Sequence, residues 1–235
     1  MVEKATLVLL NKNELKGLKV LFDRIPIKEV DEVFTIDPGS TDGSIEFLKS
    51  KGIKVVHQDV PGRGEAFRIG AKVARNENIV FFSPDGNEDT NDILKLVYWL
   101  NNGYDMAIAS RFMKESRADD SNKLIPLRSF GNRIFTLFVN LFWGGSLTDS
   151  INGFRAVKRS KFFELNPDAH GFCIEIQMSI RALKLRHKIK EIPTYEGDRI
   201  GGESTLYTFR TGVRYWKTIF REFRVGKNFL QQKSL

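Results

Sequence analysis

Four short loops in the first half of the chain are rich in carboxylates, amides and glycines, and each directly follows an apolar run. They span residues 11–14, 37–44, 59–64 and 83–89. Oxygen ligands of this kind suit Mg²⁺ or Mn²⁺, and glycines allow a ligand to approach the backbone closely. One loop of this composition is usually a turn or a helix cap. Four in succession indicate a site for a nucleotide and a metal ion.

The segments between these loops alternate between strand and helix patterns. We expect strands over residues 6–10, 32–36, 53–57, 78–82 and 104–109, and helices over residues 14–22, 42–50, 65–75 and 89–100, with Asp42 as the N-cap of the second helix. Strands separated by helices of about ten residues predict an α/β fold, with a mostly parallel central sheet and helices on both faces. Ligands of such sheets bind beyond the carboxyl ends of the strands, where the four loops lie.

The composition narrows the class of protein. The chain has 235 residues, 41% of them hydrophobic and 28% charged, which is typical of a folded domain rather than a disordered or fibrous protein. Its one cysteine, Cys173, excludes an intrachain disulfide and a cysteine-based zinc site. The net charge of +8 indicates an anionic partner such as phosphate or acidic lipid. No nucleic-acid-binding motif occurs, so we expect no nucleic acid partner.

Two common nucleotide-binding patterns are missing from the sequence. No GxGxxG follows the first expected strand, which argues against a dinucleotide enzyme, and no GxxxxGK[ST] occurs, which argues against a P-loop NTPase. The N-terminus lacks a signal-peptide pattern, and no stretch reaches the roughly 18 apolar residues of a spanning helix. Together with the single cysteine, these features favour a cytoplasmic protein.

Seven short motifs occur in a defined order along the chain. They are N-E at residues 13–14, D-P-G-S-T-D-G at 37–43, G-R-G-E-A at 62–66, S-P-D-G-N at 83–87, Arg128 with Gly131 and Asn132, Thr148 and Asp149 with G-F-R at 153–155, and D-R-I-G-G-E-S at 198–204. Together they resemble the inverting family 2 glycosyltransferases, in the branch of dolichyl-phosphate mannose synthase and the polyprenyl-phosphate glycosyltransferases. The resemblance covers residues 7–206.

The resemblance implies a fold of the GT-A type and an enzyme that moves a hexose, mannose or glucose, from a GDP- or UDP-sugar to a polyprenyl or dolichyl phosphate. It also implies roles for individual residues. Asn13, Glu14, Asp37 and Arg63 would bind the nucleotide sugar, Asp85 and Asn87 the Mg²⁺ or Mn²⁺ ion, Arg199 the leaving diphosphate, and Arg111, Arg128 and Asn132 the acceptor phosphate, while Asp149 would lie near the reacting carbon. The candidate catalytic residues are thus Asp149, Arg199 and Asp85.

Two positions depart from the family pattern. Pro38 replaces the second Asp of its loop, and Ser83 replaces the first Asp of the metal motif. Asp85 can still ligate a divalent ion, because Mg²⁺ often takes only one or two protein carboxylates, but we expect a lower affinity. Three alternatives stay open: a saccharide or protein acceptor with Asp149 as general base, a non-catalytic relative that binds nucleotide sugar, and a nucleotidyltransferase. The order of the later motifs argues against the last.

The C-terminal part of the chain suggests a membrane contact. We divide the chain into a catalytic domain, residues 1–204, and a basic amphipathic helix with a tail, residues 205–235. The helix expected over residues 205–227 repeats Leu206, Phe209, Val213, Trp216, Phe220 and Phe223 at helical spacing, and its six basic residues against Glu222 give a charge of +5. Such a helix suits an anionic membrane surface.

We therefore expect a protein that is peripheral to the cytoplasmic face of the membrane, with a separate membrane protein as a further partner. A second aromatic segment, residues 126–143, is also expected to be a helix and could contribute to the same contact. The alternative for both segments is that they pack on the domain core or bind a partner protein.

Overall fold

A seven-stranded sheet forms the centre of the molecule. The computed structural model describes residues 3–118, 125–200 and 208–231. The strand order is β3-β2-β1-β4-β7-β5-β8, and all neighbours are parallel except that β7 is antiparallel to β4 and β5. The strands are β1 (Glu3–Leu10), β2 (Val30–Asp37), β3 (Lys54–His57), β4 (Asn78–Phe82), β5 (Met106–Ser110), β7 (Arg155–Lys158) and β8 (Ile189–Pro193); β6 (Arg117–Ala118) and β9 (Tyr195–Glu196) pair separately. The predicted mostly parallel sheet is confirmed.

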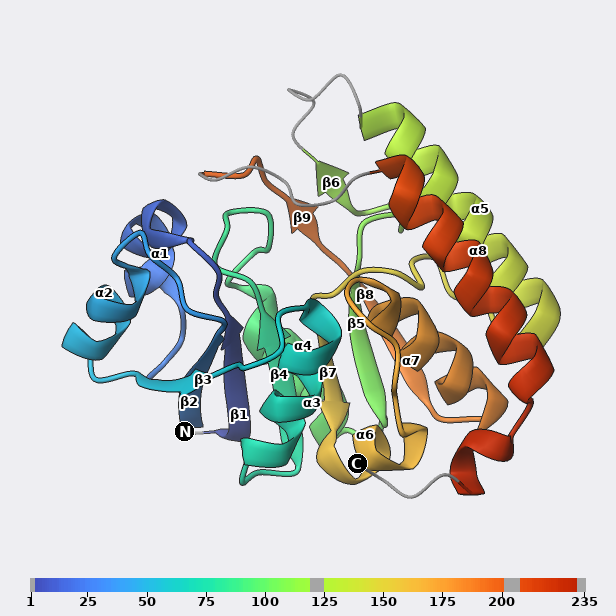
Figure 1. The fold of residues 1–235 in the computed structure, drawn as a ribbon, viewed down its shortest axis with the longest axis horizontal. Coiled ribbons are helices and arrows are strands. Elements are labelled where there is room, and N and C mark those ends of the chain that lie inside the picture. Colours follow the sequence, from blue (N-terminus) through green and yellow to red (C-terminus); the bar gives the residue numbers. More distant parts are fainter. Residues whose placement is uncertain (1–2, 119–124, 201–207, 232–235) are drawn as a thin grey trace.

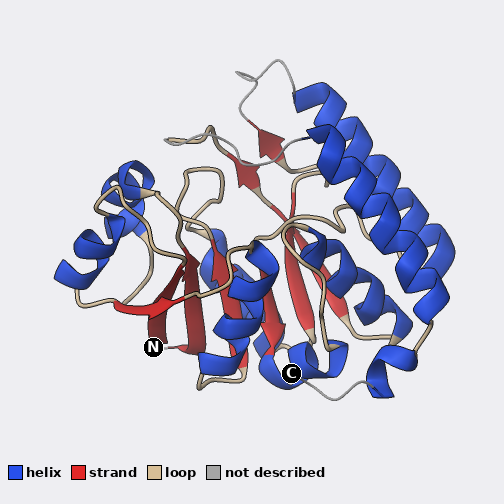
Figure 2. Cartoon of the chain, viewed as in Figure 1, coloured by secondary structure: helices blue, strands red, loops and turns tan. Residues whose placement is uncertain are grey.

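Helices cover both faces of this sheet (Figure 1 and Figure 2). The helices on the sheet are α1 (Leu15–Leu21), α2 (Ser44–Ser50), α3 (Arg63–Val73), α4 (Asp92–Asn101), α6 (Arg159–Leu165) and α7 (Cys173–Lys184). Two more helices, α5 (Ile125–Trp143) and α8 (Thr208–Val225), and short 3-10 turns at Phe22–Arg24 and Asn228–Gln231 complete the described chain.

The alternation of side chains along β1 explains the two layers of helices. Leu7 and Leu9 pack in one apolar cluster with residues of α1, α2 and α4, whereas Val8 and Leu10 pack in another with residues of α3, α6 and α7. Successive side chains of a strand point to opposite faces of the sheet. A strand that is apolar on both faces therefore needs cover on both, which is the arrangement expected of a parallel sheet.

Helices α5 and α8 form a further layer outside α7. Val139 of α5, Ile176 and Ile180 of α7, and Tyr215 and Ile219 of α8 share a third apolar cluster. One face of α8 is therefore packed on the domain, which agrees with the alternative that this segment packs on the domain core. The expected boundary between residues 204 and 205 falls outside the described residues and stays a prediction. No helix in the described part of the chain has both the length and the apolar character to cross a membrane.

Helix α2 begins two residues later than predicted. Gly43, not Asp42, is its N-cap residue and has a left-handed backbone with φ of 90°. The Asp42 carboxylate instead accepts hydrogen bonds from the Ser44 N–H and hydroxyl at 3.0 and 2.6 Å, and from the Leu15 N–H at 2.8 Å. Asp42 thus joins the first turns of α1 and α2, and it fixes both helices beside the site described next.

Candidate active site

The loops singled out by the sequence meet at one edge of the sheet. Strands β1, β2, β4 and β5 run in the same direction, so their carboxyl ends lie together, toward the top of Figure 1. This is the edge where α/β sheets bind ligands. Residues 11–14, 37–44 and 83–89 follow β1, β2 and β4 at this edge. The segment after β9, residues 197–200, returns to the same place.

Asp37 organises the loop that follows β2. Its buried carboxylate accepts hydrogen bonds from the N–H groups of Gly39 and Ser40, each at 2.7 Å, and from the Ser40 hydroxyl and the Asn11 amide. Asn13 donates its N–H to the Ser40 hydroxyl at 2.8 Å and accepts a backbone N–H of the same loop. These bonds hold the loop against the end of β1. The expected contact of Asp37 and Asn13 with base and ribose stays a prediction.

Arg199 joins two carboxylates that are far apart in the sequence. Its Nη1 donates to Asp85 Oδ2 at 3.1 Å, and its Nη2 donates to Glu14 Oε1. Burial raises the pKa of Glu14 to about 7; the positive charge of Arg199 opposes this rise, and the nearby charge of Asp85 adds to it. Three residues chosen from separate motifs are therefore in contact. In this group two carboxyl groups face one guanidinium.

The segment that carries Arg199 lies against the loop after β4. The Ile200 N–H donates to the Asp85 carbonyl at 2.9 Å, and the Gly197 N–H donates to the Asn87 carbonyl at 3.2 Å. Gly86 has φ of 101°, and a Cβ at this position would lie only 2.6 Å from the Ile200 side chain. Both the backbone conformation and the close contact require glycine here. This fit places Arg199 over Asp85.

Asn87 has a buried side-chain oxygen without a donor among the described residues. Within this part of the chain its Oδ1 accepts no hydrogen bond, and the same holds for Glu14 Oε2. From the residues that the structure describes, Asp85 Oδ1 accepts the Asn87 N–H alone, at 3.1 Å, which leaves it further lone pairs. Among the described residues, no three Asp, Glu, His or Cys side chains gather in a way that could hold a metal ion. The oxygens of Asp85 and Asn87 fit a Mg²⁺ or Mn²⁺ ion that phosphate and water also ligate.

Arg63, at the start of α3, connects a second set of acidic residues. Its Nη1 donates to the Ser83 hydroxyl at 2.9 Å, its Nε pairs with Glu175, and its Nη2 lies 3.7 Å from Glu88 Oε1. The other Glu88 oxygen accepts the Ser83 N–H at 2.7 Å. Burial raises the pKa of Glu88 to about 8, although the Arg63 charge lowers it. Glu88 thus places a carboxyl group beside Ser83, where the family pattern has Asp.

Sequence reasoning did not select Glu88 or Glu175. Glu88 lies within the loop at residues 83–89, and this position was its only sequence signal. Glu175 lies on α7, in a segment without a motif, and only the folded chain brings it to Arg63.

Arg111, directly after β5, holds Asp149 in a bidentate ion pair. Arg111 Nε lies 2.7 Å from Asp149 Oδ2, and Nη2 lies 3.1 Å from Oδ1. Asp149 is fully buried and also accepts the N–H groups of Ile151 and Asn152. Burial lowers the pKa of Arg111, but the charges of Asp149 and Glu196 outweigh this effect and raise it overall. The two hydrogen bonds to Asp149 fix the orientation of the Arg111 guanidinium.

The remaining predicted acceptor residues lie on α5. Arg128 and Asn132 are one turn apart on this helix, so their positions share a face. Asn132 is half-buried. The side chain of Arg128 and the last motif residues, 201–204, lie outside the described part of the chain. The structure thus brings Glu14, Asp85 and Arg199 into one group and Arg111 and Asp149 into a second, and Glu196 lies 3.6 Å from Arg111 in the segment that leads to Arg199.

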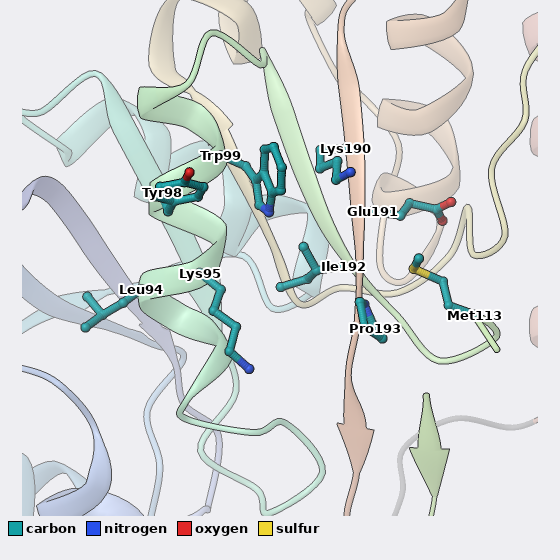
Figure 3. A pocket seen from close by; sticks show the side chains of 9 residues that line it. All are labelled: Leu94, Lys95, Tyr98, Trp99, Met113, Lys190, Glu191, Ile192 and Pro193. Carbon is teal, nitrogen blue, oxygen red and sulfur yellow. The ribbon is translucent and has the colours of Figure 1, made fainter. Parts of the chain in front are cut away.

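A pocket lies between α4 and the edge strand β8 (Figure 3), and Glu191 in its wall accepts the Asp149 N–H at 2.7 Å. Its walls are mainly apolar and include Tyr98, Met113 and Ile192, while Lys190 lies 4.3 Å from the centre of the Trp99 ring. The pocket holds no pair of carboxylates, so we assign the reaction to the loop edge instead.

Comparison with known families identifies the chain. The model of Glycosyl transferase family 2 matches residues 6–165, which include the four loops at residues 11–14, 37–44, 59–64 and 83–89. The chain belongs to this family. The predicted family and enzyme class are therefore confirmed.

Several relatives in the family have related activities in their names. The glycosyltransferase AglJ of Haloferax volcanii is 30% identical over 196 residues, which are 83% of this chain and 63% of AglJ. The low-salt glycan biosynthesis hexosyltransferase Agl6 of the same organism is 29% identical and is covered over 44% of its length. The dolichol-phosphate mannosyltransferase of Pyrococcus furiosus is 29% identical over 228 residues, 93% of this chain and 63% of that protein. The chain thus spans less than two thirds of these relatives.

Solved structures confirm the predicted GT-A type of fold. Glucosyl-3-phosphoglycerate synthase from Mycobacterium tuberculosis, in complex with Mn²⁺, UDP and glucosyl-3-phosphoglycerate, superposes with a TM-score of 0.70 and 22% identity, over 96% of this chain and 80% of that one. A structure of the same enzyme holds Mg²⁺ and UDP, with a TM-score of 0.70 and 21% identity. At this identity the likeness is one of fold.

Proposed function

We propose that this protein is an inverting hexosyltransferase that moves mannose or glucose from a GDP- or UDP-sugar to a polyprenyl or dolichyl phosphate at the membrane surface. The observation that carries the proposal is the contact of Glu14, Asp85 and Arg199 at the carboxyl edge of a family 2 sheet. The relatives support the acceptor: the P. furiosus protein is a dolichol-phosphate mannosyltransferase, and a dolichyl-phosphate hexose transferase of H. volcanii is 24% identical over 190 residues.

On the donor side, the chain's own residues would hold the diphosphate and its cation. Asp85 and Asn87 offer oxygens to Mg²⁺ or Mn²⁺, which would supply positive charge to the leaving diphosphate. Arg199 donates two N–H groups at the same place and can turn them to phosphate oxygens. Asn13, Asp37 and Arg63 lie on the surrounding loops and would bind the rest of the nucleotide sugar. Glu88 holds the Ser83 backbone in position.

On the acceptor side, the proposed reaction needs little base strength. A lipid phosphate is already anionic at neutral pH, so its oxygen can attack once it is positioned. Arg111, Arg128 and Asn132 would bind that phosphate, because guanidinium donors match phosphate oxygens. Asp149, which we propose lies near the reacting carbon, keeps Arg111 oriented through its two hydrogen bonds. Arg111 already binds both carboxylate oxygens of Asp149. This pairing supports a phosphate acceptor over an alcohol acceptor, because an alcohol would need a free base.

A transfer assay tests this proposal. The purified full chain is incubated with Mg²⁺ or Mn²⁺ and a panel of radiolabelled GDP- and UDP-sugars, with or without polyprenyl phosphate in detergent, and the label in the organic phase is counted. We expect label only when lipid phosphate and metal are both present, and the active donor names the sugar. Label that appears instead on an added saccharide or phosphoglycerate would reject the lipid acceptor. Binding of a nucleotide sugar without any transfer would reject catalysis.

We further propose that the chain works at the cytoplasmic face of a membrane, beside a separate membrane protein. The basic charge of the chain supports this location, because the anionic lipids of that face attract polybasic segments. Fractionation of cells that express the full chain tests it: recovery in the membrane fraction that is lost on a high-salt wash is the expected result.

A further inference from the structure

Helices α5 and α8 lie side by side along one flank of the molecule (Figure 1). Edge-to-face aromatic contacts join them: Phe138 and Trp216 have ring centres 4.8 Å apart, and Phe142 and Phe223 have centres 5.7 Å apart. Beside this seam, both helices expose large apolar side chains. These are Phe130 (63%), Leu137 (63%), Leu141 (72%) and Phe142 (41%) on α5, and Val213 (41%), Phe220 (58%) and Phe223 (63%) on α8. We call this set the α5–α8 face.

The packing of the domain does not account for the α5–α8 face. Each helix already has a separate buried side: Phe135 and Val139 of α5, and Tyr215 and Ile219 of α8, lie in the apolar cluster with α7. The exposed side chains point elsewhere and remain in water. Soluble monomers rarely expose large contiguous apolar patches, and such patches mark contacts with proteins or membranes.

The exposed charged side chains described on α5 and α8 themselves are all basic. A row of basic residues on α8 and just after it is exposed: Arg210, Arg214, Lys217, Arg224 and Lys227. Helix α5 contains no acidic residue, and the one acidic residue of α8, Glu222, is fully buried in contact with Arg181 and Lys184. The fold has therefore removed the only negative charge of α8 from its outer surface.

We propose that the α5–α8 face inserts into the surface of an anionic membrane. The apolar side chains enter the boundary between headgroups and acyl chains, and the basic row binds lipid phosphates. This proposal rests on the proposed transfer to a lipid phosphate, which requires the protein to reach a membrane. A second copy of the chain fits this face less well, because a symmetric dimer would place two basic rows near each other. The sequence suggested both segments as membrane contacts without showing that they adjoin, and the structure places them side by side.

The orientation of the two helices agrees with the reaction. The first residues of α5 and α8 lie on the same side of the molecule as β6 and β9, beside the loop edge that holds the candidate active site (Figure 1). A membrane bound along these helices would therefore lie next to the Arg111 side of the site. A lipid phosphate could reach that side without leaving the headgroup layer.

Vesicle binding of the full chain tests the α5–α8 face. The probe is phosphatidylcholine vesicles with or without phosphatidylglycerol, in the absence of any nucleotide sugar. We expect the wild-type chain to sediment with the anionic vesicles only. The variant L137Q/L141Q/F220Q should bind them on the order of a hundredfold more weakly. The variant R214Q/K217Q/R224Q should also lose about a hundredfold, because each basic residue near an anionic surface is worth about fivefold.

Matched controls carry the same changes elsewhere. V20Q/V60Q/Y98Q replaces exposed apolar residues away from the face, and K16Q/K19Q/K49Q removes three exposed lysines from α1 and α2. Face variants that bind like the wild type, or controls that lose as much as the face variants, would overturn the proposal. The proposal would also be overturned if the wild-type chain formed a dimer without lipid and the L137Q/L141Q/F220Q variant were a monomer. Sugar transfer by the face variants to lipid phosphate in detergent is measured separately. Loss of vesicle binding with unchanged transfer would support the membrane face, whereas loss of transfer in every protein, including the wild type, would contradict the proposed reaction alone.

Discussion

The two carboxylates that share Arg199 are in different environments, and this difference decides which of them can bind a ligand. Glu14 is buried, and its pKa is raised to about 7, so a large part of it is protonated near neutral pH. Asp85 keeps more contact with solvent and has lone pairs free beside the unpaired oxygen of Asn87. We infer that Asp85 meets the metal ion, while Glu14 holds Arg199 in place.

The Asp85→Asn variant tests this assignment. The amide keeps the size of the side chain but removes its charge, so we expect weaker Mn²⁺ binding in the presence of UDP and a transfer rate lower by roughly two to three orders of magnitude. Mn²⁺ titration followed by electron paramagnetic resonance measures the first effect independently of turnover. Asp89→Asn, in the same loop, is the control. Equal Mn²⁺ affinity in wild type and Asp85→Asn would remove Asp85 from the metal site.

Gly86→Ala tests the contact between the loop after β4 and residues 197–200. The added methyl group would lie 2.6 Å from Ile200 and 2.9 Å from the Asp198 carbonyl, at φ of 101°. We expect a loss of about 1–3 kcal/mol in the free energy of unfolding and a larger loss of transfer, because Arg199 moves away from Asp85. Urea unfolding and the transfer assay measure the two effects. Gly52→Ala, at a positive φ with open space around it, is the control for backbone strain alone. Unchanged transfer would show that this contact is dispensable.

The sequence identified several residues of the candidate site, but it did not predict which side chains form ion pairs with them. Glu14, Asp85 and Arg199 could be selected because each lies in a short motif near a strand end or a late loop. The pairing of Arg111 with Asp149, 38 residues away, and of Arg63 with Glu175, 112 residues away, could not be selected. These pairs depend on tertiary packing, which no local pattern encodes.

At the scale of elements, the first half of the fold was predictable, and in the second half the helices expected over residues 126–143 and 205–227 are found as α5 and α8. The elements between these two helices were not predictable. Strands β1 to β5 alternate with α1 to α4, and both their apolar periods and their loops are clear in the sequence. Helix α7 gave no such signal because it is buried nearly all round, so its apolar side chains do not fall on one face. Strand β7 has four residues and runs against its neighbours, which no alternation of strands and helices predicts.

The packing of α8 on the domain should become less stable at acid pH. Burial would raise the pKa of Asp168, but hydrogen bonds from Arg221 and Gln177 and the charge of Arg181 lower it to about 2. A lowered pKa stabilises the fold above the unfolded value of 3.8, and this contribution is lost as the pH falls toward 2. Asp168→Asn should therefore cost about 1–2 kcal/mol above about pH 5 and almost nothing near about pH 2.

Urea unfolding of wild type and Asp168→Asn across this pH range measures the difference. Asp23→Asn, an exposed carboxylate far from α8, is the control. A difference that stays constant with pH would contradict the ion pairs as its origin.

At the scale of the whole molecule, a net charge of +8 and an apolar flank act together. If the basic row contributes as proposed, binding to anionic vesicles should weaken as salt rises, because the Debye length falls from about 8 Å at 0.15 M to about 3 Å at 1 M. Sedimentation with vesicles at increasing NaCl measures this. The R214Q/K217Q/R224Q variant should show a shallower dependence. Identical salt dependence in both proteins would exclude the basic row.

Helix α7 also has a consequence for how this protein can evolve. Its Glu175 pairs with Arg63, which contacts Ser83 of the candidate site, and its Arg181 pairs with Glu222 of α8. Eleven of its twelve residues are buried, so hardly any position is free to drift without a compensating change elsewhere. Among descendants of this chain, the loops around the site can diversify toward new sugars, while α7 is expected to change slowly and in concert with its partners.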